Sequence, residues 1–86
     1  MKTKQPQSYK WNPGDLIAPK DAAALLGYKS PRNFQDDRRL AHIAKDFESV
    51  GCKFTTNIFI TGGNRRFLRS QIDAYLSRLV ELAENN

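Results

Sequence analysis

The sequence predicts a small, mainly α-helical domain with one β-hairpin. The chain has 86 residues, which is enough for a single hydrophobic core. Apolar residues recur at helical spacing in the first half of the chain and again near its end. Between these stretches, β-branched and aromatic residues surround Gly62-Gly63-Asn64, a pattern typical of a hairpin. The expected order is therefore helix, tight turn, helix, hairpin, helix.

The first 14 residues differ in character from the rest. They are polar and basic and contain no acidic residue, and they show no sustained helical or strand period. We expect residues 1–14 to form a flexible basic arm, and residues 15–86 to form the folded domain. Tyr9 and Trp11 are the exception within the arm, where they either cover an edge of the core or contact a ligand.

The first helix is marked at both of its ends. Pro19 suits the first helical position, where its missing N–H costs nothing. The alanine- and leucine-rich run that follows favours a helix over 19–26. Gly27 ends it. After a short turn, Ser30-Pro31 places an N-cap residue before a proline, which indicates the start of a second helix.

The extent of the second helix is open. An apolar stripe runs from Leu40 to Val50 at helical spacing, but Phe34 points almost the opposite way. Residues 31–48 therefore form either one helix, bent near 37–39, or two short helices over 31–39 and 40–49. Asp36 and Asp37 are expected to pair with a neighbouring arginine or to lie near a positive helix N-terminus.

The hairpin and the last helix follow. Strands are predicted at 57–61 and 65–68, with the two glycines allowing positive φ at a narrow tip. Ser70 and Asp73 resemble a capping box, which predicts a final helix over 70–84. We expect its apolar stripe, which runs from Ile72 to Ala83, to belong to the core. The alternative is a spare apolar edge that supports self-association.

Charge and composition limit the function classes. The net charge is +5, and between Ser49 and Ile72 there are four cationic residues and no acidic one, which favours an extended anionic partner such as a phosphate backbone. The single cysteine and single histidine are too few for a zinc site. No apolar run is long enough to span a membrane. We expect a cytoplasmic protein without metal, cofactor or membrane contact.

The predicted order of elements is that of a winged helix-turn-helix. A helix in the major groove needs hydrogen-bonding side chains near its N-terminus, because that end meets the base edges. The candidates at the second helix are Lys29, Ser30, Arg32, Asn33 and Gln35, with Arg38 and Arg39 further on for phosphate contact. The alternative is an exposed first turn without a ligand.

The hairpin supplies a second set of candidates, which could reach the minor groove or flanking phosphates. Because strand residues alternate faces, Arg65 and Arg66 cannot both point the same way. The alternative for both is a solvated hairpin tip. The candidate residues of this wing are Gly63, Asn64, Arg65, Arg66 and Arg69.

These motifs together resemble a known family. From Leu16 to about Leu79 the chain is similar to the winged-helix DNA-binding domain of excisionase and AlpA-like regulators, relatives of the MerR-type fold. The resemblance depends on Pro19 to Ala23 with Leu25-Leu26-Gly27, on Ser30 to Phe34, and on Gly62 to Phe67 running into Ser70 to Leu76. It implies that Phe34 faces inward. About 20 residues with helical character, Leu40 to Phe59, replace the short connection that the family usually has before the hairpin.

The resemblance implies a sequence-specific double-stranded DNA-binding protein of a phage or mobile element. Such proteins act as recombination directionality factors (excisionases) or as transcriptional regulators, with an integrase or recombinase, or copies of themselves on repeated sites, as further partners. The alternative is a small protein-interaction adaptor or inhibitor with the same fold. An enzyme is not expected, because the sequence has one histidine and one cysteine, with no phosphate loop and no plausible triad.

Overall fold

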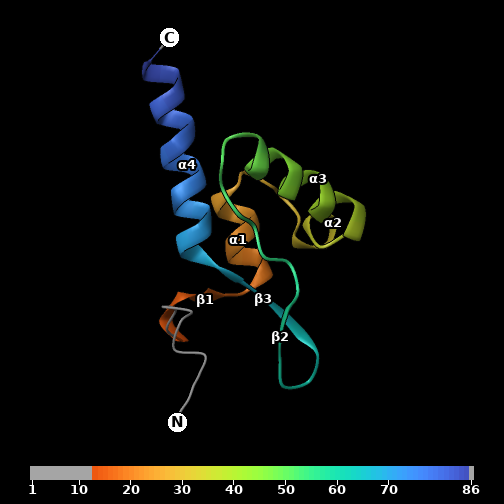
Figure 1. The fold of residues 1–86 in the computed structure, drawn as a ribbon. Coiled ribbons are helices and arrows are strands. Elements are labelled where there is room, and N and C mark those ends of the chain that lie inside the picture. The colour runs from red at the N-terminus through yellow and green to blue at the C-terminus, as the bar shows by residue number, and fades with distance from the viewer. Residues whose placement is uncertain (1–12, 86) are drawn as a thin grey trace.

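The computed structural model describes residues 13–85 (Figure 1). Most of the expected flexible arm, including Tyr9 and Trp11, lies outside the described residues. The described part is mainly helical, with a small three-stranded antiparallel sheet, which confirms the predicted class. The elements are η2 (Pro13–Asp15), β1 (Leu16–Ile17), α1 (Pro19–Leu25), α2 (Pro31–Phe34), α3 (Asp37–Ser49), β2 (Ile58–Ile60), β3 (Asn64–Leu68) and α4 (Arg69–Glu84).

Helix α1 begins and ends close to its predicted bounds. Pro19 occupies the first turn after an extended Ala18. The helix ends at Leu25, and Gly27 follows with a φ of 86°, a conformation that favours glycine. Ser30 stands at the N-cap position of α2, as predicted, but its side chain makes no capping hydrogen bond.

The second helical stretch is two helices, and the break lies earlier than either alternative placed it. Helix α2 is a single turn that ends at Phe34, and α3 begins at Asp37. The cause is Asp36, whose Oδ1 accepts the backbone N–H of Arg38 at 2.8 Å and that of Arg39 at 3.4 Å. An N-cap residue adopts extended backbone, and here ψ is 131°. This backbone cannot continue the helix.

The sheet has one strand more than predicted. Its order is β1-β3-β2, and β1 pairs antiparallel with the far end of β3 through Leu16 opposite Leu68. Strand β2 is one residue shorter at each end than predicted, and β3 begins one residue earlier. Ile60 opposite Asn64 is the last pair before the turn. Gly62 and Gly63 have φ of 88° and 78°, so the expected positive φ at the tip is confirmed.

Aromatic rings join the elements into one core. The largest fully buried side chains are Phe34, Phe47, Phe67 and Ile72, which come from α2, α3, β3 and α4. The ring centroids of Phe34 and Phe67 lie 5.1 Å apart, and Tyr75 of α4 stacks on Phe47 at 3.9 Å. Burial of Phe34 against β3 explains why it leaves the apolar stripe of α3. It faces a different neighbour.

The last helix lies within a residue of its predicted bounds, but the predicted capping box is wrong. Helix α4 begins at Arg69, with Leu68 at the N-cap position. Ser70 does not cap it, because its N–H and its hydroxyl donate to the two carboxylate oxygens of Asp15, at 2.9 and 2.6 Å. Asp73 forms an ion pair with Arg69 at 3.6 Å. This side of the helix is therefore tied to the segment just before β1, which lies far away in the sequence.

Only the first half of α4 belongs to the core. Ile72 is buried and Tyr75 and Leu76 pack partly against the core, but Leu79 and Val80 are exposed. The expectation that the whole stripe is core is wrong for this second half, because α4 extends beyond the other elements (Figure 1). Among residues 13–85, no helix is both long and apolar enough to cross a membrane.

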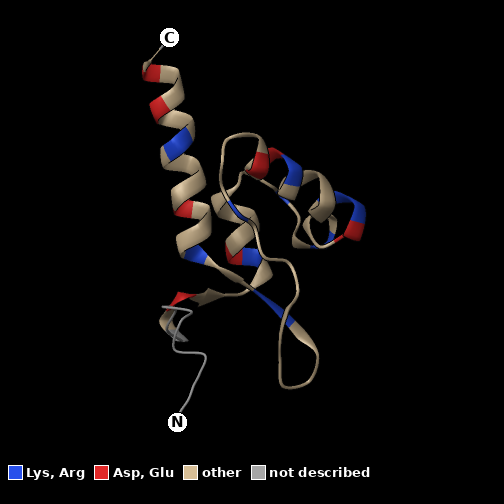
Figure 2. Ribbon diagram, in the orientation of Figure 1, with Lys and Arg blue, Asp and Glu red and all other residues tan. Residues whose placement is uncertain are grey.

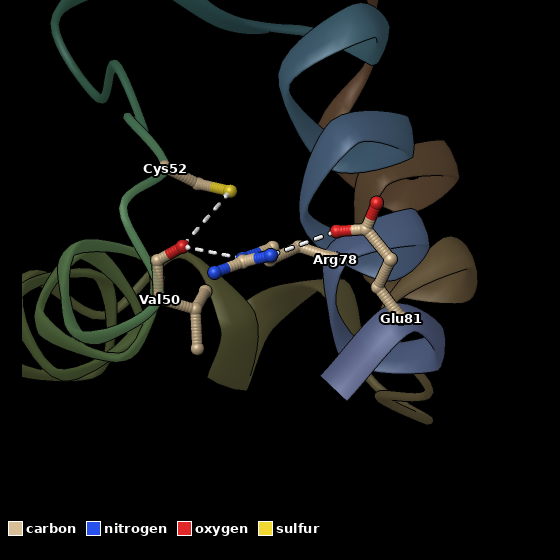
Figure 3. A network of polar contacts seen from close by, with 4 residues as sticks. All are labelled: Val50, Cys52, Arg78 and Glu81. Carbon is tan, nitrogen blue, oxygen red and sulfur yellow. Dashed lines mark hydrogen bonds and ion pairs between the residues drawn. The ribbon is translucent and has the colours of Figure 1, made fainter. Parts of the chain in front are cut away.

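One contact attaches α4 to the end of α3 (Figure 3). The Nε of Arg78 donates to the carbonyl oxygen of Val50 at 3.3 Å, and its Nη1 donates to Glu81 at 2.8 Å. Val50 follows the last residue of α3, where carbonyl groups lack helical partners and a cation is favourable. Cys52 is half-buried beside this contact, with its Sγ 4.0 Å from the same carbonyl oxygen.

Candidate nucleic-acid interface

The candidates of the helical part gather around α2 and the first turn of α3. Lys29 is exposed in the connection before α2, and Arg32 is exposed on it. Ser30 is partly buried and Gln35 is exposed, at the two ends of α2. A shallow depression of about 320 Å³ lies between the two helices and is lined by Asn33, Asp36, Arg38, Arg39 and His42. The fold thus brings Asn33 together with two arginines.

Arg39 lies over an aromatic ring. Its guanidinium carbon lies 5.7 Å from the ring centroid of Tyr28, and Tyr28 in turn lies 5.6 Å from Phe34. A cation over an aromatic face gains about 0.5–1 kcal/mol at an exposed site. In the part of the chain that the structure describes, neither Arg32 nor Arg38 has an acidic partner within ion-pair distance. Their donors remain available.

The charge around α2 and α3 is mixed. Figure 2 shows acidic and basic positions side by side at the start of α3. The carboxylate of Asp36 accepts a backbone N–H group at the N-terminus of α3. This is one of the two roles expected for Asp36 and Asp37. Asp37 lies in the first turn of α3, but it pairs with Arg65 of the hairpin, a partner that sequence reasoning missed. This helical surface is suited to selective hydrogen bonding more than to dense phosphate contact.

The two arginines of β3 lie on opposite faces of the strand. Arg65 shares a face with the buried Phe67 and lies directly opposite Phe59. Its guanidinium carbon is 5.0 Å from the ring centroid of Phe59, and its Nη2 is 3.7 Å from Asp37 Oδ1. Arg66 is on the other face, where its Nη1 donates to the carbonyl oxygen of Arg65 at 2.9 Å.

The hairpin tip presents Gly63 and Asn64, which are both exposed. Arg69 is placed elsewhere. It is the first residue of α4, at the opposite end of β3 from the tip, and five strand residues separate the two ends by about 16 Å. The fold therefore groups Asn64, Arg65 and Arg66 on the hairpin and separates Arg69 from them.

Two features of the hairpin were not anticipated. Phe59 and Ile60 are 54% and 37% exposed, so the wing carries apolar as well as basic side chains. The second feature is the set of contacts that Arg65 makes. Its pairing with Phe59 follows from the hairpin register and could have been predicted from the Gly62-Gly63 turn once the strand ends were known. Its contact with Asp37 could not have been predicted, because the two residues belong to elements that are distant in sequence.

A larger groove of about 830 Å³ lies beside the sheet. Its lining includes Leu16, Leu68 and the loop from Lys53 to Ile58. Gln71 in this groove is already engaged, since its side-chain amide exchanges two hydrogen bonds with Thr55. Across residues 13–85, no three histidine, cysteine or acidic side chains are placed to hold a metal ion.

Comparison with protein-family models, with curated proteins and with solved structures finds no match for this chain. Helices α2 and α3 present hydrogen-bonding side chains, and the hairpin presents cationic side chains.

Proposed function

We propose that the protein binds double-stranded DNA as a winged helix-turn-helix. The observation that carries the proposal is the hairpin: it contributes two arginines, its segment from Ser49 to Ile72 has no acidic residue, and Arg65 contacts the first turn of α3. A cationic hairpin next to a pair of helices matches the two contacts that such proteins make, one in a groove and one on the backbone.

In this proposal, base reading belongs to α2 and the first turn of α3. A single-turn helix offers few side chains, so the reading unit includes the connection before it and the start of the next helix. Arg32 can bond bidentately to guanine and Asn33 to adenine, and each good pair contributes about 1–3 kcal/mol of discrimination. Arg38 and Arg39 contact phosphate. The hairpin, through Asn64 and Arg66, contacts the minor groove or flanking phosphates.

The proposed biological role is that of a phage or mobile-element protein, acting as a recombination directionality factor or as a transcriptional regulator. The resemblance to excisionase and AlpA-like regulators supports this role. An integrase or recombinase, or further copies of the protein on repeated sites, would be the partners. Binding and reading of DNA need no catalytic group, and the chemistry of the described residues suits binding.

The test is selection of DNA sites by the purified protein at stated salt, followed by affinity measurements on the selected site and on random DNA. Arg32→Ala should weaken binding to the selected site by about 10- to 100-fold and binding to random DNA much less. Arg66→Ala should weaken both by a similar factor and reduce the salt dependence. Arg69→Ala is the matched control, because it removes the same charge outside the proposed interface.

Three results would contradict the proposal or a part of it. Equal loss on both DNAs after Arg32→Ala would remove this residue from base reading. If Arg69→Ala lowers the affinity for DNA as much as Arg66→Ala does, the affinity depends on net charge and not on the position of the arginine in the hairpin. Absence of any binding to DNA at low salt would refute the function itself.

A protein-interaction adaptor is the second candidate, and the far end of α4 favours it. Leu79 and Val80 lie on the part of the helix that extends beyond the core, and Val80 is 57% exposed. If this face binds a protein, a partner should co-purify with the wild type and be lost with Val80→Glu, while no DNA is bound. DNA binding that Val80→Glu leaves intact would count against this candidate.

A further inference from the structure

Arg65 is fixed between groups of two different elements. The Phe59 ring of β2 lies 5.0 Å from its guanidinium carbon, and the carboxylate of Asp37 from α3 lies 3.7 Å from its Nη2. The side chain of Arg65 is 19% exposed, whereas that of Asp37 is 92% exposed. The cation is thus held by its surroundings, while the anion beside it is almost entirely in water.

We propose that Arg65 is a phosphate-binding site at the junction of the hairpin and α3, and that Asp37 occupies this site until a DNA phosphate replaces it. The inference rests on the proposed function and adds a residue that opposes binding. Guanidinium groups bind carboxylate and phosphate through the same N–H donors. A carboxylate on Arg65 therefore marks the position that a phosphate oxygen would take.

The geometry of the pair favours exchange. A charge-assisted hydrogen bond between nitrogen and oxygen has a length of about 2.7–2.9 Å, so the 3.7 Å between Arg65 and Asp37 leaves this donor without a close acceptor. Ion pairs with an exposed member contribute little to stability. A phosphate can approach more closely and offers more acceptor oxygens, while the Phe59 ring keeps the guanidinium in the same place.

Within residues 13–85, no carboxylate other than that of Asp37 pairs with Arg65. Asp36 is adjacent in sequence, but its carboxylate accepts the N–H groups at the start of α3. The stretch that contains the hairpin has no acidic residue between Glu48 and Asp73. In the part of the molecule that the structure describes, Asp37 is therefore the one acidic residue that pairs with the hairpin.

The consequence is a measurable penalty on DNA binding. A phosphate on Arg65 and the carboxylate of Asp37 repel each other, and unit charges about 6 Å apart in a water-like medium change an affinity by roughly threefold, rising to about tenfold where part of the water is excluded. Phosphate contacts carry no sequence information. Asp37 should therefore lower the affinity for every DNA sequence by a similar factor.

The first experiment compares Asp37→Asn with Glu84→Gln in binding to a random-sequence duplex at fixed salt. Both changes remove one negative charge, and Glu84 is exposed at the far end of α4. We expect Asp37→Asn to raise the affinity about three- to tenfold and Glu84→Gln to raise it less than twofold. In an Arg65→Gln background, the gain from Asp37→Asn should largely disappear. Equal gains from both single variants, or a gain that persists without Arg65, would overturn the proposal.

The second experiment needs no DNA. Inorganic phosphate is titrated at constant ionic strength while the Nε–H signal of Arg65 is followed by NMR. Half-saturation should occur at about three- to tenfold lower phosphate in Asp37→Asn than in the wild type. Identical titrations refute the site whatever the DNA results. A lowered half-saturation in a protein that binds no DNA would keep the anion site and refute the proposed function.

Discussion

Replacing Asp36 with alanine should destabilise α3 from its first turn. The first four N–H groups of a helix lack partners within it, and the carboxylate of Asp36 accepts two of them, from Arg38 at 2.8 Å and from Arg39 at 3.4 Å. The shorter bond contributes most of the effect, since 3.4 Å is long for a hydrogen bond. Loss of such a cap costs about 1 kcal/mol, within a range of roughly 0.5–2 kcal/mol.

Asparagine separates the hydrogen bond from the charge. It keeps a side-chain oxygen that can accept the same N–H groups, but it loses the favourable interaction of a negative charge with the helix N-terminus, which is about 0.3–1 kcal/mol. The expected order of stability is wild type, then Asp36→Asn, then Asp36→Ala. For a domain of this size, 1 kcal/mol corresponds to a shift in Tm of roughly 4–8 °C.

Two measurements check the cap. Urea unfolding followed by circular dichroism gives the free energy of unfolding, and hydrogen exchange reports the N–H groups of Arg38 and Arg39 directly. Glu48→Ala is the control, because it removes an exposed acid from the last turn of the same helix. If Asp36→Ala is no less stable than Glu48→Ala, or if the two N–H groups exchange as in the wild type, the capping argument is refuted.

Three further outcomes are expected. Burial and, secondly, Asp46 raise the pKa of Tyr75 above its ordinary value of 10.0. Because the folded state holds this proton more tightly, the stabilisation is fully present below about pH 10 and is lost as the pH rises through the folded pKa. Tyr75→Phe should reduce this loss of stability, as measured by urea unfolding at a series of pH values. Phe34→Ala should cost about 3–5 kcal/mol by the same assay, and a loss under 1 kcal/mol would deny its central place in the core. Gly62→Ala should cost roughly 1–2 kcal/mol because φ is 88°, and an unchanged Tm would contradict the turn geometry.

The division of charge bears on how the proposed DNA complex would form. The hairpin segment is basic without acids, whereas the start of α3 carries two acids beside two arginines. If Asp37 opposes phosphate binding, sequence-independent attraction is reduced at the point where the hairpin meets α3. The base-reading side chains would then contribute a larger share of the total affinity, which favours discrimination between DNA sequences.

Local signals predicted the elements that local chemistry determines. Pro19 and Gly27 bracket α1 within a residue, because a missing N–H and a positive φ act on the backbone where they stand. The Gly62-Gly63 turn located the hairpin for the same reason. The alternation of strand residues predicted that Arg65 and Arg66 lie on different faces, and they do.

Predictions failed where a distant partner competed with a local one. Ser70 has the spacing of a cap, but Asp15 offers it two hydrogen bonds, and α4 begins one residue earlier. The two residues of β1 have no strand signal of their own and become a strand by pairing with β3. The stripe of α4 is helical throughout, yet within the described residues Leu79 and Val80 are left 38% and 57% exposed.

The sequence by itself determined the class of the fold, the helix that follows Pro19, the hairpin turn and the basic, acid-free character of the hairpin. These depend on backbone preferences and on composition, which act over a few residues. Only the tertiary structure decided which arginine of the hairpin meets α3, and that its partner is Asp37. That choice depends on packing between segments some 28 residues apart. No local sequence pattern predicts it, because only the packing of the core brings these two elements together.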